Sequence, residues 1–514
     1  MTSETAPALE LIGIDKRFGP VQANRAVAFS VAPGSVHGLI GENGAGKSTL
    51  MNIVYGFHPA DAGEIRVRGR KVDIRSPSDA IAAGIGMVHQ HFMLVENFSV
   101  LENVILGVEK SWSLAGGLEH ARAELLRLGR DYGLEVPLDE TVEHLPVGLQ
   151  QRVEILKALY RRADILILDE PTAVLTPAEA DQLFKMLAQL RAAGKTVILV
   201  THKLREIMAI TDRVTVMRQG QVVAEVATTT TSPAELAEKM VGRPVRWETE
   251  KAPARPGATL LEVRDLAVCD QRGIERVKGV SFDLRAGEIV GIAGVSGNGQ
   301  SELLAALSGM VSPARGTIRL AGEALQGGEG EPRRRRQLGL AHVPEDRLRM
   351  GVVARFPAED NAILGYQDRP AYNHAGFLDR QAIHTSCEAK IAAWDVRPAQ
   401  ARLRFAAFSG GNQQKLVLAR EIDSGPKILI VGQPTRGVDI GAIETIHRRL
   451  IALRDTGAAL LVVSVELEEI LNLSDRVLVM TGGEIVGELS RAEATEERLG
   501  LLMAGIRRTE EKSA

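Results

Sequence analysis

Short aliphatic runs alternate along this chain with longer stretches in which apolar residues recur at helical spacing. The runs at 36–40, 165–168, 196–200 and 428–431 are almost wholly aliphatic. Strands buried on both faces have this composition, and in parallel sheets they alternate with helices. The pattern therefore predicts an α/β fold in which helices cover a mostly parallel sheet, with any phosphate site at the carboxyl ends of the strands.

The same pattern occurs twice. The run GLIGENGAGKSTLMNIVYG from Gly38 matches GIAGVSGNGQSELLAALSG from Gly291, each an apolar strand, a Gly-rich turn and an amphipathic helix. Further on, ADILILDEPTAVLT (163–176) matches PKILIVGQPTRGVD (426–439) in the same order. A repeat of this size predicts two related domains, 1–247 and 258–514, joined by the polar, Pro-containing linker 248–257.

Length and composition agree with two domains and narrow the function. A chain of 514 residues exceeds what one core usually organises, and 45% apolar with 25% charged residues is typical of an ordinary globular protein. The net charge of −3 gives no global basic field, which disfavours a nucleic-acid partner. Residues 1–8 are polar and no run is long enough to span a bilayer, so we expect a cytosolic or peripheral protein.

A Gly-rich segment in the first half fits the phosphate-binding pattern G-x-x-x-x-G-K-[ST]. Its backbone N–H groups and the following helix N-terminus attract phosphate, Lys47 neutralises β and γ oxygens, and Ser48 is placed to hold Mg²⁺. The segment predicts an ATP and Mg²⁺ site. Its members are Gly41, Asn43, Gly44, Ala45, Gly46, Lys47, Ser48 and Thr49.

Two acids directly follow the strand 165–168. At the carboxyl end of a buried strand they would face the phosphate cradle, Asp169 towards Mg²⁺ and Glu170 towards a water for which it is the general base. Phe18, Gln90 and His202 are each weak evidence alone, since a lone His is more often structural than catalytic. Their order along the chain gives them weight.

With these motifs in this order, the chain resembles the ABC-transporter ATPases over nearly its whole length. The resemblance implies two fused P-loop ATPase domains, each with a mostly parallel sheet core, an antiparallel β subdomain and a helical subdomain. It also implies that Phe18 stacks on adenine, that Gln90 senses Mg²⁺ and the permease, that Glu170 polarises the attacking water, and that His202 contacts the γ-phosphate.

The second half has lost most of these groups. Gln300 stands where lysine is expected, and Gly432 and Gln433 replace the two acids, while Glu345 replaces Gln90 and Val465 replaces His202. Losing a charged donor weakens nucleotide binding by about tenfold to a hundredfold. Because glutamine does not accept a proton usefully, we expect no hydrolysis there, and weak binding stays open.

One motif is intact only in the second half. The run FSGGNQQK (408–415) matches the family signature, whereas its counterpart LPVGLQQR (145–152) has Pro146 and Val147 at key positions, and Thr176 stands where the second half has an aspartate. In the family, the cradle of one domain faces the signature of the other, so every intact element falls in one composite site. We hypothesise one catalytic and one non-hydrolytic site per chain, against the alternative of two active sites. The residues expected to bind ATP from the second half are Ser409, Gly410, Gly411, Gln413 and Asp439.

A tandem ATPase with one degenerate site and no membrane span resembles the bacterial importers for simple sugars and nucleosides. The run GQPTRGVDIGAIE (432–444) resembles the nucleoside branch more closely. The resemblance implies transmembrane permease subunits as partners, an extracytoplasmic substrate-binding protein acting indirectly, and a peripheral location on the cytoplasmic face of the inner membrane. The segments after Gln90 and after Glu345 are expected to receive permease helices, and no residue indicates the cargo.

Two rival functions remain. A soluble tandem ABC ATPase acting on ribosomes or nucleic acid is disfavoured by the short linker, the single complete site and the lack of a basic surface. The basic run 333–336 is more typical of a solvated loop than of a nucleic-acid contact. A regulatory module that holds ATP without consuming it is disfavoured by Glu170 and His202.

Overall fold

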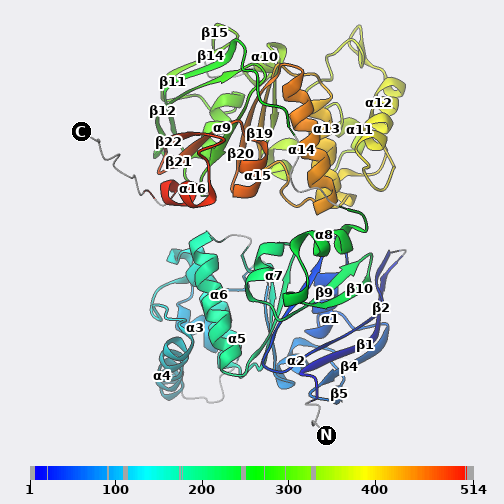
Figure 1. The fold of residues 1–514 in the computed structure, drawn as a ribbon, viewed down its shortest axis with the longest axis vertical. Coiled ribbons are helices and arrows are strands. Elements are labelled where there is room, and N and C mark those ends of the chain that lie inside the picture. Colours follow the sequence, from blue (N-terminus) through cyan, green and yellow to red (C-terminus); the bar gives the residue numbers. More distant parts are fainter. Residues whose placement is uncertain are drawn as a thin grey trace, which may run out of the picture. The chain divides into compact units, whose positions relative to one another are not determined.

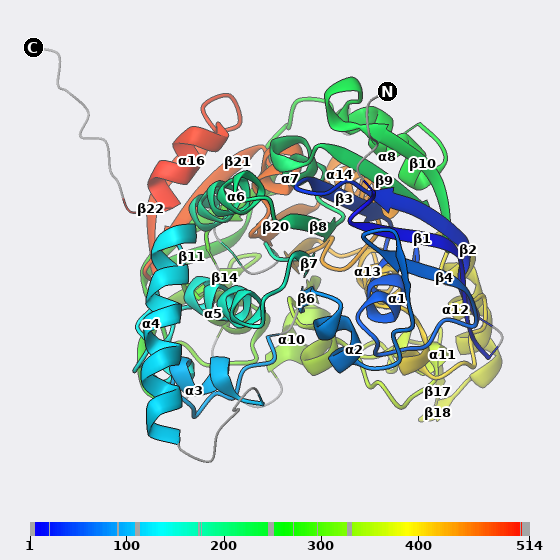
Figure 2. The same ribbon diagram turned by 90° about the horizontal axis from the view of Figure 1, so that it is seen from below.

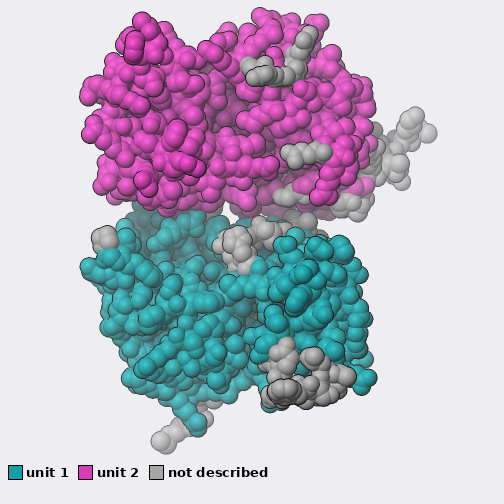
Figure 3. Space-filling view, turned by 180° about the vertical axis from the view of Figure 1, so that it is seen from behind, with its two compact units in different colours: residues 1–245 teal, residues 246–514 magenta. Residues whose placement is uncertain are grey.

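The computed structural model divides the chain into two compact units, residues 1–245 and 246–514, coloured separately in Figure 3. The described residues are 6–19, 21–89, 92–107, 114–172, 175, 177–244, 251–270, 272–295, 297–325, 331–503 and 505.

A six-stranded sheet forms the centre of the first unit, in the order β10-β9-β3-β8-β7-β6. All neighbours pair in parallel except the edge strand β10, which runs antiparallel to β9. The central strands are buried along their whole length, as expected of a parallel sheet covered on both faces. The strands are β3 (Val36–Gly41), β6 (Ile85–Val88), β7 (Ile165–Asp169), β8 (Thr196–Thr201), β9 (Arg213–Arg218) and β10 (Gln221–Ala227).

Two further layers complete this unit. An antiparallel sheet in the order β2-β1-β4-β5 packs its apolar face with the first helix, and a group of helices, α3 to α5, lies apart from that sheet in both Figure 1 and Figure 2. The antiparallel strands are β1 (Leu9–Phe18), β2 (Val21–Val31), β4 (Ala62–Val67) and β5 (Arg70–Val72). The helices are α1 (Lys47–Val54), α2 (Pro77–Ala82), α3 (Val100–Ile105), α4 (Leu114–Tyr132), α5 (Val147–Tyr160), α6 (Pro177–Ala192), α7 (Leu204–Ile210) and α8 (Pro233–Val241).

The second unit repeats this plan. Its mainly parallel sheet has the order β16-β19-β20-β13-β21-β22 and its antiparallel sheet the order β12-β11-β14-β15. The strands are β11 (Thr259–Cys269), β12 (Glu275–Arg285), β13 (Ile289–Ala293), β14 (Arg315–Leu320), β15 (Glu323–Leu325), β16 (Leu340–Val343), β17 (Asn373–His374), β18 (Phe377–Leu378), β19 (Ile428–Gly432), β20 (Ala459–Ser464), β21 (Arg476–Thr481) and β22 (Glu484–Ser490). The helices are α9 (Gln300–Ser308), α10 (Glu331–Gln337), α11 (Ala358–Asn361), α12 (Arg380–Ala393), α13 (Gly410–Ile422), α14 (Ile440–Asp455), α15 (Leu467–Leu473) and α16 (Glu496–Met503).

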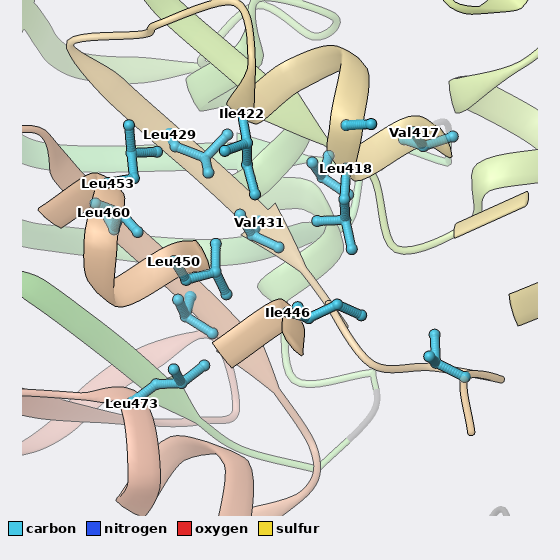
Figure 4. Packing of buried hydrophobic residues seen from close by; sticks show 14 of the residues in the cluster. Val417, Leu418, Ile422, Leu429, Val431, Ile446, Leu450, Leu453, Leu460 and Leu473 are labelled. Carbon is cyan, nitrogen blue, oxygen red and sulfur yellow. The ribbon is translucent and has the colours of Figure 1, made fainter. Parts of the chain in front are cut away.

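An aliphatic core lies between the sheet and the helices of this second unit (Figure 4). Val431 of β19 and Leu460 of β20 meet Leu418 of α13 and Leu450 of α14, all fully buried. Burying such side chains stabilises the unit by roughly 1.5–3 kcal/mol each. The predicted fold class, two α/β domains with sheet, antiparallel and helical parts, is confirmed.

One sequence interpretation is wrong. The basic run 333–336 does not form a solvated loop, because it lies in α10, where Arg335 is fully buried and donates to the carbonyls of Ala306 and Leu307. Arg336 pairs with the buried Glu421 at 2.8 Å. Four consecutive arginines give no sequence signal of which side chain is buried.

The first described residues after the gap at 245–250 belong to the second unit. The Lys251 ammonium donates to the carbonyls of Leu473 and Ser474, both at 2.8 Å, and to the carboxylate of Asp475 at 2.9 Å. Arg454 donates to the Ala252 carbonyl at 2.9 Å.

Among the described residues, no helix is both long and apolar enough to cross a membrane.

Candidate functional site

The Gly-rich turn between β3 and α1 has a backbone that only glycine adopts easily. Gly44 and Gly46 have φ of 83° and 95°, and Gly46 caps α1. A Cβ on Gly46 would lie 2.3 Å from the Ala23 carbonyl oxygen, so glycine is required there. Asn24 fixes the turn from the other side by donating to the Gly46 carbonyl at 3.1 Å. The result is a fixed Gly-rich turn that leads into a helix N-terminus, the arrangement that binds phosphate.

Lys47 lies at the start of α1 and is buried. Its ammonium donates to the carbonyls of Gly41 at 2.7 Å and Glu42 at 3.0 Å, which fold the side chain along the turn. Burial lowers the pKa of Lys47, and this outweighs the opposing effect of the Glu170 and Asp169 carboxylates. A phosphate bound at the turn would place negative charge beside this buried ammonium and favour its protonated form.

Asp169 is the last residue of β7 and faces Ser48, whose hydroxyl hydrogen bonds to its carboxyl group. Burial raises the pKa of Asp169, the Glu170 charge adds to this, and the Ser48 hydrogen bond and Lys47 oppose it. A serine hydroxyl and a carboxylate are hard oxygen ligands of the kind that Mg²⁺ binds next to nucleotide phosphates. These two residues therefore fit that metal.

Glu170 follows in a left-handed conformation with φ of 48°, and its N–H donates to the Val200 carbonyl at 2.8 Å. Its carboxylate accepts a hydrogen bond from Nδ1 of His202 at 2.9 Å. Burial raises the pKa of Glu170, but the His202 hydrogen bond and the charges of His202 and Lys47 outweigh it, so the pKa lies below its usual value. Glu170 is thus an ionised and oriented base at neutral pH, beside the cradle.

The other first-half residues divide into described and undescribed ones. Phe18 ends β1 with 43% of its surface exposed, its ring in edge contact with His58 at 5.3 Å. An exposed aromatic face of this kind fits stacking on a base. Gln90 and Thr176 lie outside the described residues, so the role expected of Gln90 stays a prediction.

The second unit keeps the backbone of the cradle. Gly297 and Gly299 have φ of 89° and 97°, and a Cβ on Gly299 would lie 2.2 Å from the Arg276 carbonyl oxygen. Gln300 donates to the Val295 carbonyl at 3.1 Å, the position at which Lys47 contacts Glu42. Gln433 also repeats the Glu170 conformation, with φ of 50°. The second unit has therefore lost the charges of Lys47 and Glu170 but keeps the backbone conformation of both turns.

The signature residues of the second unit start α13. Ser409 caps the helix, is exposed, and accepts from the Asn412 amide at 2.8 Å, with Gly410 and Gly411 opening the first turn. Gln413 is buried instead, and its amide donates to the carbonyls of Phe405 and Phe408.

Asp439 caps α14 by accepting from the Ala442 N–H at 2.7 Å. The contact of these second-unit residues with nucleotide in the first-unit cradle stays a prediction.

A cavity of about 330 Å³ in the first unit was not foreseen from the sequence. Tyr55, Phe57 and Met93 line it with apolar surface, and the buried Glu154 and the partly buried Lys157 of α5 line it with ionisable groups. Glu154 accepts from the Met93 N–H at 2.7 Å and Lys157 donates to the Met93 carbonyl at 3.0 Å, which holds the segment shortly after Gln90 against α5. Phe57 and Met93 are exposed by 42% and 57%, which no sequence pattern indicated. The family resemblance pointed only to the segment after Gln90.

Comparison with known proteins agrees with this geometry. A protein-family profile described as ABC transporter matches residues 25–173 and again 277–436. The nucleoside import ATP-binding protein NupA of Lactococcus lactis subsp. cremoris (strain MG1363) is 48% identical over 98% of this chain and 99% of its own. The guanosine import ATP-binding protein NupO of Bacillus subtilis (strain 168) is 47% identical over 97% of each chain.

Similarity also extends to a protein named for a sugar. The glucose import ATP-binding protein TsgD13 of Haloferax volcanii (strain ATCC 29605) is 43% identical over 98% of this chain and 96% of its own. Overall similarity therefore spans proteins named for different cargoes.

Proposed function

Because this chain belongs to the ABC transporter family, as an ATP-binding and ATP-hydrolysing subunit, we propose that it powers the import of nucleosides through membrane permeases. Its similarity over full length to two proteins named for nucleoside or guanosine import supports this cargo class. The observation that carries the proposal of catalysis is the ionised Glu170, held by His202 beside a complete phosphate cradle.

The proposed division of labour in the first unit follows from the groups present. The cradle N–H groups and Lys47 bind the phosphates, and Ser48 and Asp169 would hold Mg²⁺, which supplies positive charge to the β and γ oxygens. Glu170 would accept a hydrogen bond from the attacking water, orient it and take its proton, because the lowered pKa keeps this carboxylate ionised. His202 keeps that carboxylate in place through the 2.9 Å hydrogen bond and, as the family resemblance implies, reaches the γ-phosphate.

We further propose that each chain has one hydrolytic site. Phe18 would stack on adenine, and Gln90 would report on Mg²⁺ and the permease. The signature side would contribute Ser409, Gly410, Gly411, Gln413 and Asp439. This proposal rests on the distribution of intact and altered motifs, since Gln433 offers no base in the second unit.

The permease would dock at the cavity lined by Tyr55, Phe57 and Met93. The cavity combines apolar side chains with the ionisable groups of Glu154 and Lys157, and its volume of about 330 Å³ is large enough for one or two side chains of a short helix. Docking there would place the chain peripherally on the cytoplasmic face of the inner membrane, with a substrate-binding protein acting only through the permeases.

The experiment is ATP hydrolysis by the chain reconstituted in lipid with its permeases and binding protein. Purine nucleosides are compared with free pentoses and hexoses at equal concentration. Stimulation by nucleosides alone supports the proposal. Stimulation only by free sugars would assign the chain to sugar import, the second candidate suggested by TsgD13, and indifference to both would contradict either cargo.

A further inference from the structure

The second unit holds a carboxylate in the space next to Gly432, where the sequence has a glycine in place of an acid. Strand β19 ends at Gly432, the counterpart of Asp169. A Cβ on Gly432 would lie 2.4 Å from Cγ of Glu345, so the Glu345 side chain occupies the space that any side chain at 432 would need. Glu345 follows the neighbouring strand β16 and lies two residues after its end. The first unit has Gln90 at this position.

This carboxylate has the same partner as the one it replaces. The Ser301 hydroxyl donates to Oε2 of Glu345. In the first unit the corresponding Ser48 hydrogen bonds to Asp169. The pairing of a hydroxyl with a carboxylate is therefore present in both units, although the acid comes from a different strand in each. Two substitutions that look like separate losses in the sequence compensate each other in space.

The phosphate cradle next to this pair is also intact in its main chain. Gly297 and Gly299 keep the left-handed conformations of the first cradle, and the N-terminus of the nine-residue helix α9 follows them. The family profile independently matches this half of the chain, residues 277–436. A Mg²⁺ ion bound to nucleotide phosphates needs only one or two protein oxygens, and here a hydroxyl and a carboxylate are together.

We propose that Ser301 and Glu345 form a divalent-cation site that lets the second unit hold a nucleoside triphosphate without hydrolysing it. The cation offsets the charge that Gln300 no longer supplies, so binding at this site depends strongly on the metal. At the position of Glu170 the second unit has no base to activate water, because Gln433 stands there and accepts from the Val465 N–H at 3.4 Å. The proposal goes beyond the function above, which needs only the first site.

The test measures binding of radiolabelled ATP to the full chain by equilibrium dialysis, with Mg²⁺ or with EDTA. A Lys47→Ala/Asp169→Asn background removes the first site, so the remaining binding belongs to the second unit. We expect this background to bind a single ATP, and only with Mg²⁺. Adding Glu345→Gln, which keeps size and hydrogen bonding but removes the charge, weakens binding by about tenfold or more. The control Glu497→Gln, on the exposed face of α16, leaves it unchanged.

A swap variant separates metal binding from folding. Glu345→Gln combined with Gly432→Asp moves the carboxylate back to the position it has in the first unit, and we expect it to restore most of the Mg²⁺-dependent affinity. Gly432→Asp alone leaves Glu345 in place and clashes with it, so we expect this variant to bind no more tightly than the background. Binding that is absent, that survives EDTA, or that is unaffected by Glu345→Gln would overturn the proposal. Hydrolysis by the first site is not the readout, so failure here leaves the proposed function untouched.

Discussion

At the scale of single residues, the turn after β7 and its counterpart after β19 have the same backbone conformation but different side chains. Glu170 and Gln433 both adopt a left-handed conformation, which costs a residue other than glycine about 1 kcal/mol or more. Each is held by the same hydrogen bond from its N–H to the adjacent strand, to Val200 or to Val463. The strain therefore belongs to the turn and persists where the base is gone. Under the proposed function, the first site is catalytic because of the Glu170 carboxylate and its partner His202.

His202→Ala tests this partnership. Removing the imidazole removes the hydrogen bond and charge that lower the pKa of Glu170, so burial dominates and that pKa rises. The base then becomes protonated at higher pH, and the acidic limb of the kcat profile moves upward. We expect kcat to fall by roughly tenfold to a hundredfold at neutral pH, since the base also loses its orientation. The profile is measured on the reconstituted complex.

Val465→Ala, at the matching position of the second unit, is the control and should leave both kcat and its pH profile unchanged. A shift of the acidic limb to lower pH in His202→Ala would contradict the sign argued here.

At the scale of elements, the aliphatic runs predicted the central strands closely. The predicted strand 36–40 is Val36–Gly41 in the structure, and 165–168 is Ile165–Asp169. These succeeded because a strand buried on both faces has a distinctive composition. The direction of side chains was beyond this reasoning. The local pattern does not show that Arg335 faces inward. It also does not show that Glu345 fills the space beside Gly432, where the first unit has Asp169. Both depend on contacts between elements far apart in sequence.

His342 on strand β16 makes the stability of the second unit depend on pH. Burial lowers the pKa of His342 to about 4, with Glu421 opposing and Arg336 and Arg420 adding to the shift. No hydrogen-bond partner of its Nε2 is found within the described residues. Below about pH 6.5 the unfolded chain takes up a proton that the folded chain refuses until about pH 4, so stability falls as the pH drops through this window.

His342→Met places at this position the residue that the first unit has, Met87. We expect the wild type to lose about 2 kcal/mol more stability than this variant between pH 7 and pH 5. Chemical unfolding followed by circular dichroism at both pH values gives the double difference. Equal losses in the two proteins would show that His342 titrates normally and is not held neutral.

At the scale of the whole molecule, the chain consists of two units with one plan and unequal chemistry. The repeat was visible in the sequence because glycines and aliphatic strands were kept. The place at which the chain between them is anchored was not visible, because Lys251 is an ordinary polar residue by pattern. It contributes three hydrogen bonds to the segment from Leu473 to Asp475.

Lys251→Met should loosen residues 251–257 from the second unit. The loss of a partly buried ammonium with three acceptors is expected to destabilise that unit by about 1–3 kcal/mol and to speed amide exchange across the segment. Hydrogen exchange with mass spectrometry and thermal unfolding measure the two effects. Lys239→Met, which removes an exposed pair with Glu235 on α8, is the control and should change stability by less than about 1 kcal/mol. Unchanged exchange at 251–257 would show that Lys251 does not anchor the segment.

The central claim is that the first unit hydrolyses ATP and the second does not. The most direct measurement is steady-state ATP hydrolysis by the reconstituted complex for Glu170→Gln and, at the matching position, for Gln433→Ala. We expect Glu170→Gln to lose about a hundredfold or more of the rate while still binding ATP, and Gln433→Ala to keep most of it. Substantial turnover in Glu170→Gln, or an equal loss in Gln433→Ala, would contradict a single hydrolytic site.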